Sequence, residues 1–179
     1  NQTSRSYALI RWLDIWTAKN CQSLIVISEQ FKRIYIQDRG IEEGKIVVVP
    51  NWIDPNNILV NHQDYSIREQ HNIPEDAFLV VYGGNIGVAA GVDTLIQAFE
   101  YLGDFEKVYL LIAGEGSMLD QCRAFAKTSG NARIIFHSPW PVDETPSVLS
   151  AANLFVLPTQ GNQSLVSVPS KLMNYLLAA

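Results

Sequence analysis

Short apolar runs alternate with amphipathic segments along most of this 179-residue chain. Each run spans four to six residues and lacks the apolar–polar alternation of a strand with one solvated face. This pattern predicts strands that are buried on both faces of a parallel sheet. The predicted strands lie at 23–27, 45–49, 78–82, 108–113, 133–137 and 154–157. Helical periodicity occurs at 5–19, 28–38, 66–71, 92–102, 118–128 and 146–152, and again from 169 onward. The alternation predicts an α/β fold with a doubly wound, Rossmann-like parallel sheet and helices on both faces.

Several helix ends carry local signals. Ser28 precedes one helical segment as an N-cap, and Gly130 ends another. The spacing of Ser117 and Asp120 predicts a capping box at the start of the helix at 118–128. Pro146 is expected at the first position of the following helix.

Residues 50–57 interrupt the alternation with proline, asparagine and aspartate, which is typical of a linker. The chain opens inside one amphipathic pattern and stops inside another, so we expect a fragment of a larger protein. Trp12 and Trp16 lie one turn apart in the opening helix. They are expected either to pack against the sheet or to contact a membrane surface peripherally.

Composition narrows the class of protein. Hydrophobic residues make up 47% of the chain and charged residues 17%, which indicates a packed core and excludes a disordered segment. The formal net charge of −5 disfavours nucleic acid as a partner. Cys21 and Cys122 have no CxxC spacing, so we expect reduced thiols in a cytoplasmic protein. No apolar run is long enough for a transmembrane helix.

The stretch 78–91 is the most informative part of the chain, because an apolar run ends there in a glycine-rich loop that opens into a helix. Glycines let backbone N–H groups approach a ligand, and a helix N-terminus favours an anion. The loop is therefore a candidate phosphate-binding site. Tight packing at a strand-to-helix turn is the alternative explanation for its glycines.

Five loops would meet at the carboxyl edge of such a sheet, where ligands bind in doubly wound folds. They are the segments 83–87, 114–116, 137–140, 159–164 and 169–171. We expect these loops to form one binding site.

Individual residues in these loops suggest particular contacts. Glu115 could accept hydrogen bonds from a diol, or it is a solvated turn residue. Trp140, between two prolines, could stack on a base or a sugar, or it packs in the core. Lys171 lies in the first turn of a helix, where a cation opposes the macrodipole. This placement suggests an anionic partner, and a surface lysine is the alternative.

The histidines predict no metal site. His137 is interpreted as a structural histidine at a strand end, without a partner in the sequence pattern. His62 and His71 share no metal-ligand spacing with it.

Six segments occur in the order of a known family: 23–28, 45–54, 82–91, 113–117, 136–140 and 168–179. On these residues the chain resembles the retaining glycosyltransferases with two Rossmann-like domains, the GT-B architecture. It is most similar to the group 1 glycosyltransferases of bacterial surface-polysaccharide pathways. The resemblance implies that 1–50 end an acceptor-binding domain, that 51–57 form a hinge, and that 58–179 are an incomplete nucleotide-sugar-binding domain.

The resemblance also implies where the donor binds. The donor-binding residues would be Gly84, Asn85, Gly87, Glu115, Gly116, Ser138, Trp140, Gln163, Ser164, Ser170, Lys171 and Asn174. The chain departs from the family at the arginine and lysine of the glycine loop, whose places Asn85 and Ala90 take. Two family glutamates are replaced by Val166 and Asn174. Lys171 is expected to supply the cation that the glycine loop lacks.

The implied activity is transfer of a sugar from a nucleoside-diphosphate sugar to a hydroxyl group, with retention of configuration. A UDP-sugar is favoured over a GDP-sugar, and the acceptor would be a glycan or a lipid-linked glycan. No metal or cofactor is implied, and no catalytic residue can be named. The location would be the cytoplasm, with peripheral attachment to the inner face of the membrane as one option. A UDP-sugar epimerase and a non-catalytic nucleotide-sugar-binding module are the alternatives.

Overall fold

The computed structural model describes residues 5–54, 64–158 and 169–178. The chain divides into two compact units. We call them the N-unit, of which residues 5–51 are described, and the C-unit, of which residues 52–54, 64–158 and 169–178 are described.

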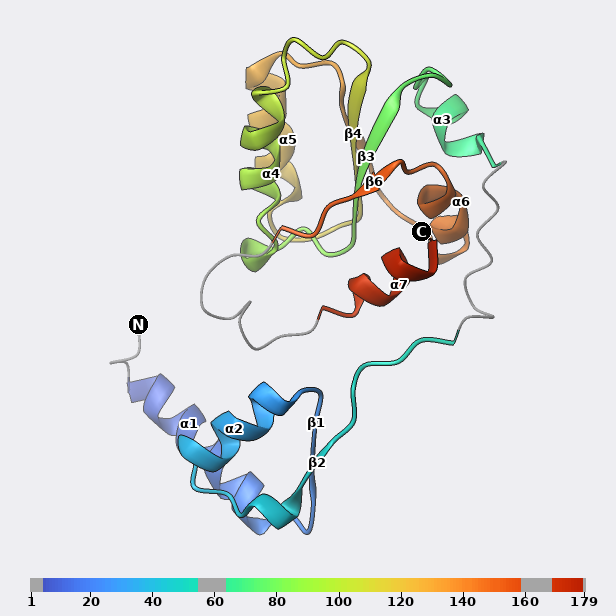
Figure 1. Ribbon diagram of the computed structural model, residues 1–179. Coiled ribbons are helices and arrows are strands. Elements are labelled where there is room, and N and C mark those ends of the chain that lie inside the picture. Colours follow the sequence, from blue (N-terminus) through green and yellow to red (C-terminus); the bar gives the residue numbers. More distant parts are fainter. Residues whose placement is uncertain (1–4, 55–63, 159–168, 179) are drawn as a thin grey trace. The chain divides into compact units, whose positions relative to one another are not determined.

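The N-unit contains two parallel strands with helices beside them (Figure 1). Its elements are α1 (Arg5–Asn20), β1 (Leu24–Val26), α2 (Glu29–Gln37), the 3-10 helix η1 (Glu43–Lys45) and β2 (Ile46–Val48). Ser28 caps α2 as predicted, because its side chain accepts a hydrogen bond from the backbone N–H of Phe31 at 3.1 Å. Buried aliphatic side chains from α1, β1, β2 and the loop after α2 form a small core.

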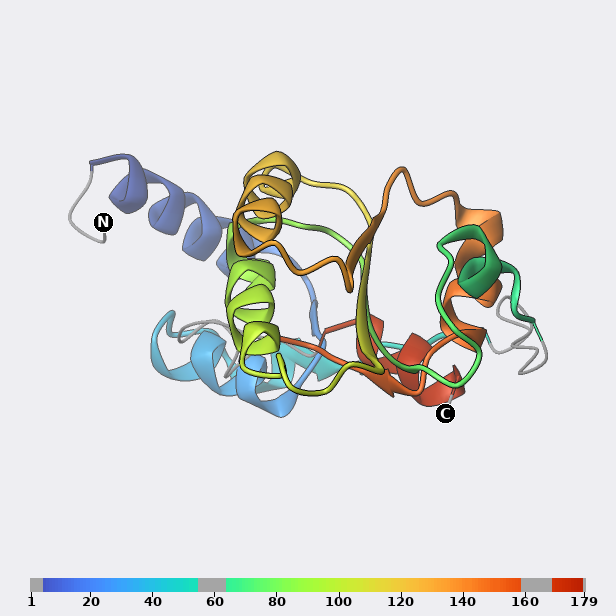
Figure 2. The same ribbon diagram turned by 90° about the horizontal axis from the view of Figure 1, so that it is seen from above.

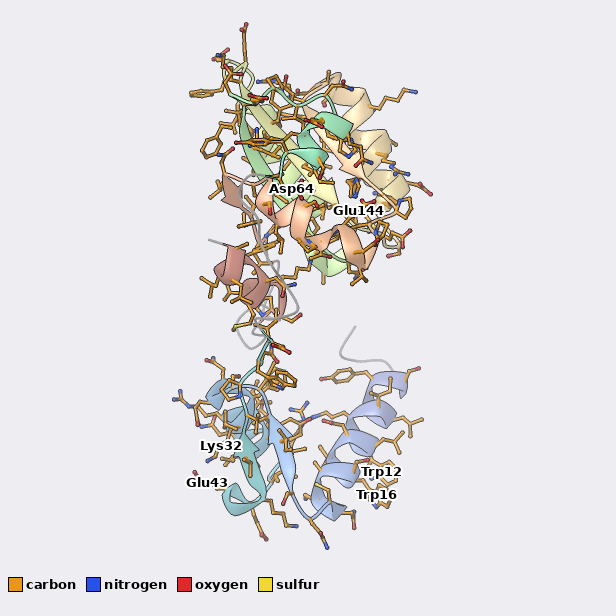
Figure 3. All side chains as sticks on the ribbon, turned by 90° about the vertical axis from the view of Figure 1, so that its right-hand side faces the viewer. Trp12, Trp16, Lys32, Glu43, Asp64 and Glu144 are labelled. Carbon is orange, nitrogen blue, oxygen red and sulfur yellow. The ribbon has the colours of Figure 1, made fainter. Side chains whose placement is uncertain are left out.

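One face of α1 is apolar and exposed within the N-unit. Trp12 and Trp16 stack with ring centroids 6.5 Å apart, and both side chains are more than half exposed (Figure 3). Figure 3 also labels Lys32 and Glu43, which form an ion pair at 3.0 Å between α2 and η1.

Among the described residues, no helix combines the length and the apolar character needed to cross a bilayer.

The C-unit is built on a parallel sheet of β3 (Phe78–Gly83), β4 (Val108–Ala113), β5 (Ile134–His137) and β6 (Leu154–Phe155). The strand order is β5-β4-β3-β6. The sheet therefore begins at β3, which lies inside it. The next two strands, β4 and β5, are added on one side of β3, and β6 is then added on its other side. This order confirms the predicted doubly wound sheet, with its switch point between β3 and β6.

Helices cover both faces of this sheet, as predicted. Figures 1 and 2 show α4 (Val92–Glu100) and α5 (Leu119–Ser129) along one face, with α3 (Ser66–Gln70) and α6 (Thr145–Ser150) along the other. Alternate residues of β3 enter the two cores: Val80 and Tyr82 pack under α4 and α5, while Leu79 and Val81 face α3 and α6. The remaining elements are η3 (Val88–Ala90), η4 (Val142–Glu144) and α7 (Lys171–Ala178).

The predicted capping box at the start of α5 is wrong. The helix begins at Leu119 with Met118 as its N-cap, and no side chain caps it. The N–H of Met118 donates instead to the carbonyl oxygen of Ile86 at 3.0 Å. A contact with the glycine loop after β3 thus sets the start of this helix. Gly130 ends α5 in the left-handed conformation, as predicted. Pro146 occupies the second position of α6, one residue later than expected.

A buried arginine, which local sequence patterns do not predict, joins α3 to the segment before β6. Arg68 is only 5% exposed and donates only to uncharged oxygens. These acceptors are the carbonyl oxygens of Pro74, Ala77 and Ala151 and the side-chain oxygen of Asn153, at 2.8–3.1 Å. Burial lowers the pKa of Arg68. The guanidinium joins α3 and the segment before β3 to the segment before β6, which is 83 residues further along the chain at Ala151.

Candidate functional site

The loops after β3, β4 and β5 meet at the carboxyl edge of the sheet, as predicted. Backbone hydrogen bonds continue between them beyond the strands. The N–H of Gly84 donates to Ala113 at 2.8 Å, and that of Gly114 donates to His137 at 3.0 Å. The N–H of Ile86 donates to the carbonyl oxygen of Glu115 at 2.7 Å. These loops therefore form one connected surface, but several of their N–H groups are already bonded.

Two glycines are explained by packing. Gly114 has φ +138°, and a Cβ atom on it would overlap the carbonyl oxygen of Gly84. Gly116 has φ +154°, and a Cβ atom there would overlap the carbonyl oxygen of Ile86. The neighbouring backbone lies so close that positions 114 and 116 must each be glycine. At Gly114 and Gly116, close packing against the backbone of the glycine loop after β3 is what the structure shows.

Two further glycines, Gly83 and Gly84, are covered by side chains that the sequence analysis singled out. A Cβ atom on Gly83 would lie 2.8 Å from Cη2 of Trp140. A Cβ atom on Gly84 would lie 2.6 Å from Nζ of Lys171. Trp140 and Lys171, which are 31 residues apart in sequence, therefore lie over adjacent glycines at the end of β3.

Lys171 is the first residue of α7, and its ammonium reaches back to β3. Nζ donates to the hydroxyl oxygen of Tyr82 at 2.6 Å and lies 4.2 Å from the centroid of that ring. Burial lowers the pKa of Lys171, and no carboxylate among the described residues pairs with it. A half-buried cation without an acidic partner is a candidate anion site.

Tyr82 supports this cation, and sequence reasoning missed it. The ring is fully buried, and its hydroxyl donates to the carbonyl oxygen of Asn85 at 2.7 Å. Burial raises the pKa of Tyr82, so the phenol stays neutral at physiological pH. It holds the ammonium by a hydrogen bond and by its ring face, and leaves the positive charge uncompensated.

Tyr175, also missed, attaches α7 to the end of β3. Its hydroxyl oxygen accepts a hydrogen bond from the N–H of Gly83 at 2.8 Å. Its ring stacks on Phe155 of β6, with centroids 4.5 Å apart and planes 12° from parallel. The side chain spans the switch point between β3 and β6 and brings the start of α7 to the glycine loop.

His137 is buried at the end of β5 and lies beside another side chain, as expected for a structural histidine. Nδ1 of His137 lies 3.0 Å from Nε2 of His71. Nε2 of His137 lies 2.7 Å from Oε2 of Glu144 in η4, although the angles are not those of a hydrogen bond. Burial, together with nearby His137, lowers the pKa of His71, and Glu144 opposes this shift. Within the described part of the chain, no group of acidic, histidine or cysteine side chains is arranged to hold a metal ion.

The remaining predicted residues are spread around this edge. Ser138 follows β5, and its carbonyl oxygen lies 3.5 Å from a guanidinium nitrogen of Arg123. The Glu115 side chain is exposed after β4, and Asn174 lies one helical turn beyond Lys171 in α7. Ser170 is exposed just before α7, and Gly87 packs against the side chain of Asn85. Gln163 and Ser164 lie outside the described residues.

Trp140 shows features of both its interpretations. The ring packs at the edge of the core beneath α3 and α6, as expected for a structural residue. Its indole nitrogen is buried and has no hydrogen-bond partner among the described residues. A buried donor without a partner is costly, so this N–H is a candidate for contact with a ligand.

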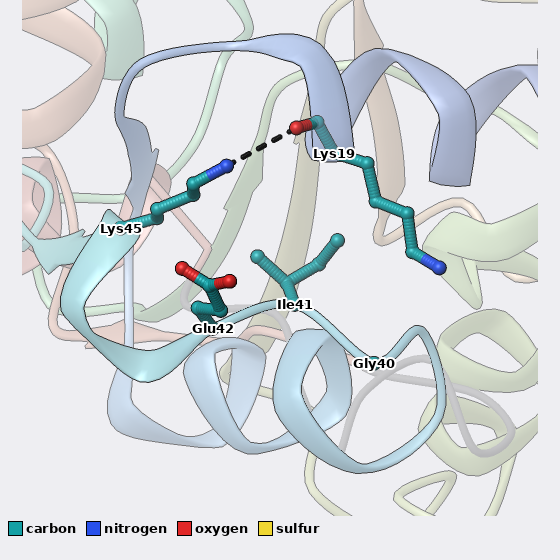
Figure 4. Close-up of a pocket in the computed structure, with 5 residues that line it drawn as sticks. All are labelled: Lys19, Gly40, Ile41, Glu42 and Lys45. Atoms are coloured by element: carbon teal, nitrogen blue, oxygen red, sulfur yellow. Dashed lines mark hydrogen bonds between the residues drawn. The ribbon is translucent and has the colours of Figure 1, made fainter.

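A separate hollow of about 320 Å³ lies in the N-unit, between the end of α1 and the loop before η1 (Figure 4). Lys19, Gly40, Ile41, Glu42 and Lys45 line it. Nζ of Lys45 donates to the carbonyl oxygen of Lys19 at 3.2 Å. The hollow carries charges of both signs, and none of its lining residues belongs to the predicted donor site.

The strand order and the helices on both faces define a doubly wound, parallel α/β domain. A family model described as glycosyl transferases group 1 matches residues 64–163, more than half of the chain. The chain belongs to this family. A second model, Glycosyltransferase Family 4, matches residues 2–57.

Individual proteins agree with this assignment. The putative colanic acid biosynthesis glycosyl transferase WcaI of Escherichia coli K12 is 23% identical over 141 residues, covering 78% of this chain and 34% of WcaI. The chain thus spans about a third of that relative. WaaG, a glycosyltransferase involved in lipopolysaccharide biosynthesis, has a TM-score of 0.79 at 16% identity, covering 99% of this chain and 48% of WaaG. Anabaena Alr3699/HepE, solved with UDP and glucose, has a TM-score of 0.75 at 16% identity, covering 94% of this chain and 45% of HepE. These structures share the GT-B fold class predicted from the sequence.

Proposed function

We propose that the protein containing this chain transfers a sugar from a nucleoside-diphosphate sugar to a hydroxyl group of a glycan or lipid-linked acceptor. A UDP-sugar is favoured over a GDP-sugar, and the anomeric configuration is retained. The observation that carries the proposal is the meeting of Trp140, Lys171 and the glycine loop at the switch point of a doubly wound sheet. Family membership supplies the reaction class.

The named neighbours support the choice of substrates. HepE was solved with UDP and glucose, which favours a uridine nucleotide here. WcaI and WaaG are named for colanic acid and lipopolysaccharide biosynthesis, so we propose a role in cell-surface glycan synthesis. The proposed location is the cytoplasm. Peripheral contact of the exposed apolar face of α1 with the inner face of the membrane is part of the proposal.

Different residues at the edge of the sheet would bind different parts of the donor. Trp140 would stack on the base and offer its indole N–H, and Asn174 would bind the ribose. Lys171 would face the diphosphate. The other proposed donor-binding residues are Gly84, Asn85, Gly87, Glu115, Gly116, Ser138, Gln163, Ser164 and Ser170.

The proposed mechanism depends on charge stabilisation. Cleavage of the glycosidic bond leaves negative charge on the departing diphosphate, and a preorganised cation stabilises that charge best where water is excluded. The half-buried ammonium of Lys171 fits this task. The proposal requires neither a metal ion nor a cofactor, and it assigns no catalytic acid or base.

One observation weighs against epimerisation. An epimerase needs acid and base groups free to reach the substrate. At the described edge of the sheet, the histidines and Glu144 lie against one another, and His137 is only 4% exposed. A binding module without activity remains the second candidate, because Asn85, Ala90 and Asn174 replace charged residues of the family.

The test uses protein expressed from its complete coding sequence. It is incubated with UDP-glucose, UDP-galactose, UDP-N-acetylglucosamine or GDP-mannose, each with and without lipid-linked glycan acceptors, in buffer containing EDTA. Release of UDP that depends on the acceptor, with an α-linked product by NMR, supports the proposal. The proposal is overturned if the donor sugar is epimerised. It is also overturned if the nucleotide binds but no sugar is transferred to any acceptor.

A further inference from the structure

The glycine loop after β3 carries no cation of its own. Residues 83–91 contain neither lysine nor arginine. The N–H groups of Gly84 and Ile86 already donate to the loop after β4. A diphosphate at this edge would therefore need a positive charge from another element.

We infer that Lys171 provides this charge, and that Tyr82 is the positioning residue that holds the Lys171 ammonium over Gly84 in readiness for a diphosphate. The inference rests on the proposed function and deepens it, because it assigns the recognition of one part of the donor to two side chains.

The geometry allows the ammonium to bind an anion without moving far. Its three N–H groups include one that donates to Tyr82 at 2.6 Å, and no carboxylate among the described residues uses the others. The aliphatic stem crosses the face of Gly84, where any side chain would collide with it. The stem is thereby confined, so little rotamer entropy remains to be lost when an anion binds.

Tyr82 is suited to hold a cation without neutralising it. The phenol is fully buried, and its own proton is directed to the carbonyl oxygen of Asn85 at 2.7 Å. Its oxygen therefore presents a lone pair to Lys171, and its ring face lies 4.2 Å from Nζ. An aspartate or glutamate in that place would form an ion pair and cancel the charge that the diphosphate needs.

The consequence is selectivity for the phosphate part of the nucleotide. Loss of Lys171 should weaken binding of UDP but not of uridine, because only UDP carries the anionic groups. Loss of the Tyr82 hydroxyl should act in the same direction and more weakly, since the ammonium remains but is no longer held.

The experiment measures UDP and uridine affinities by calorimetry, using protein expressed from its complete coding sequence. Lys171→Met should weaken UDP binding by about tenfold or more and leave uridine binding unchanged. Lys171→Arg should restore most of the UDP affinity. Tyr82→Phe should weaken UDP binding by about two- to fivefold. The affinity for uridine should stay unchanged in this variant.

Two matched controls exclude general effects of charge and of hydroxyl loss. Lys107→Met removes the same charge at the amino end of β4, at the opposite edge of the sheet. Tyr109→Phe removes a hydroxyl from β4 within the other core. Both should bind UDP as the wild type does. Thermal melting of every variant identifies any that fail to fold, and Lys171→Arg keeps the inference testable if Lys171→Met is among them.

The outcomes separate this inference from the proposed function. If wild-type protein binds UDP and Lys171→Met binds it equally well, the inference is overturned while the proposed function stands. A parallel loss of UDP and uridine affinity also overturns the inference, because it indicates a structural role. If the wild type binds neither UDP nor GDP, the proposed function fails together with the inference.

Discussion

The carbonyl oxygen of Gly84 occupies the space that a side chain on Gly114 would need. Gly84 is the first residue after β3, and Gly114 is the first residue after β4. This contact therefore joins two adjacent loops at the carboxyl edge of the sheet. The N–H of Gly84 also donates to Ala113, the residue before Gly114. The edge on which the proposed donor site lies is thus a packed backbone surface.

Gly114→Ala should strongly destabilise the C-unit. The new Cβ atom would meet backbone atoms that cannot rotate away, at a φ of +138° that disfavours any L side chain. We expect the free energy of unfolding to fall by about 1–3 kcal/mol. Urea unfolding followed by circular dichroism measures this loss. Gly103→Ala is the matched control, since its Cβ atom would make only an ordinary contact at 3.5 Å, and equal losses in the two variants would contradict the argument.

Arg68→Met should destabilise the C-unit through unpaired carbonyl groups. The change keeps an apolar stem of similar length but removes the guanidinium donors from the oxygens of Ala77 and Ala151, and it leaves the oxygen of Pro74 with only the N–H of Ala77. A charged donor to buried oxygens contributes more than a neutral one, so we expect a loss of about 3 kcal/mol. The midpoint of urea unfolding checks this. Lys107→Met, in which an exposed ion pair with Asp76 is lost, should leave the midpoint unchanged, and a similar shift in both would refute the role assigned to burial.

The local pattern was sufficient to predict the sheet and much of its edge. Short apolar runs gave the six strands, and the glycine run between β3 and α4 marked the loop where ligands bind in such folds. Lys171 was singled out because a cation at a helix start opposes the local dipole, and it lies over the glycine loop. Its role in donor binding is still a prediction.

Contacts between distant segments could not be predicted from these patterns. Tyr82 looks like any aromatic residue of a buried strand, and Tyr175 like any apolar residue of an amphipathic helix. Their hydroxyl groups become informative only when α7 lies against β3, at a separation of 92 residues for Tyr175 and Gly83. The Ser117 capping signal failed for a related reason, because contact with Ile86 overrides the local preference.

Tyr175→Phe should loosen α7 without changing the rest of the sheet. The variant keeps the stacked ring on Phe155 but removes the hydroxyl that accepts the N–H of Gly83. That N–H is buried, so we expect a loss of about 1–2 kcal/mol in stability. Hydrogen exchange at residues 171–178 should accelerate, while exchange in β4 is unchanged. Tyr101→Phe is the control, because its side chain is 90% exposed; faster exchange in α7 of that variant would argue against the assigned contact.

Stability should fall on acidification because of the partly buried ring of His71. The pKa of His71 is lowered by burial and by His137, so the folded protein binds fewer protons at this ring than the unfolded chain does. Below the ordinary histidine pKa of about 6.5, protonation therefore favours the unfolded chain. The slope cannot exceed about 1.4 kcal/mol per pH unit for one proton, and it should be smaller because the ring is only partly buried.

Urea unfolding of the wild type and of His71→Gln, compared at pH 7.5 and pH 5.5, tests this prediction. Glutamine offers an amide donor near His137 but does not titrate. Acidification should therefore destabilise the variant less than it destabilises the wild type. Carboxylates with ordinary pKa values stay ionised over most of this range and add little to the difference. If the wild type gains stability at pH 5.5, or if the two proteins lose equal amounts, His71 is not the group responsible.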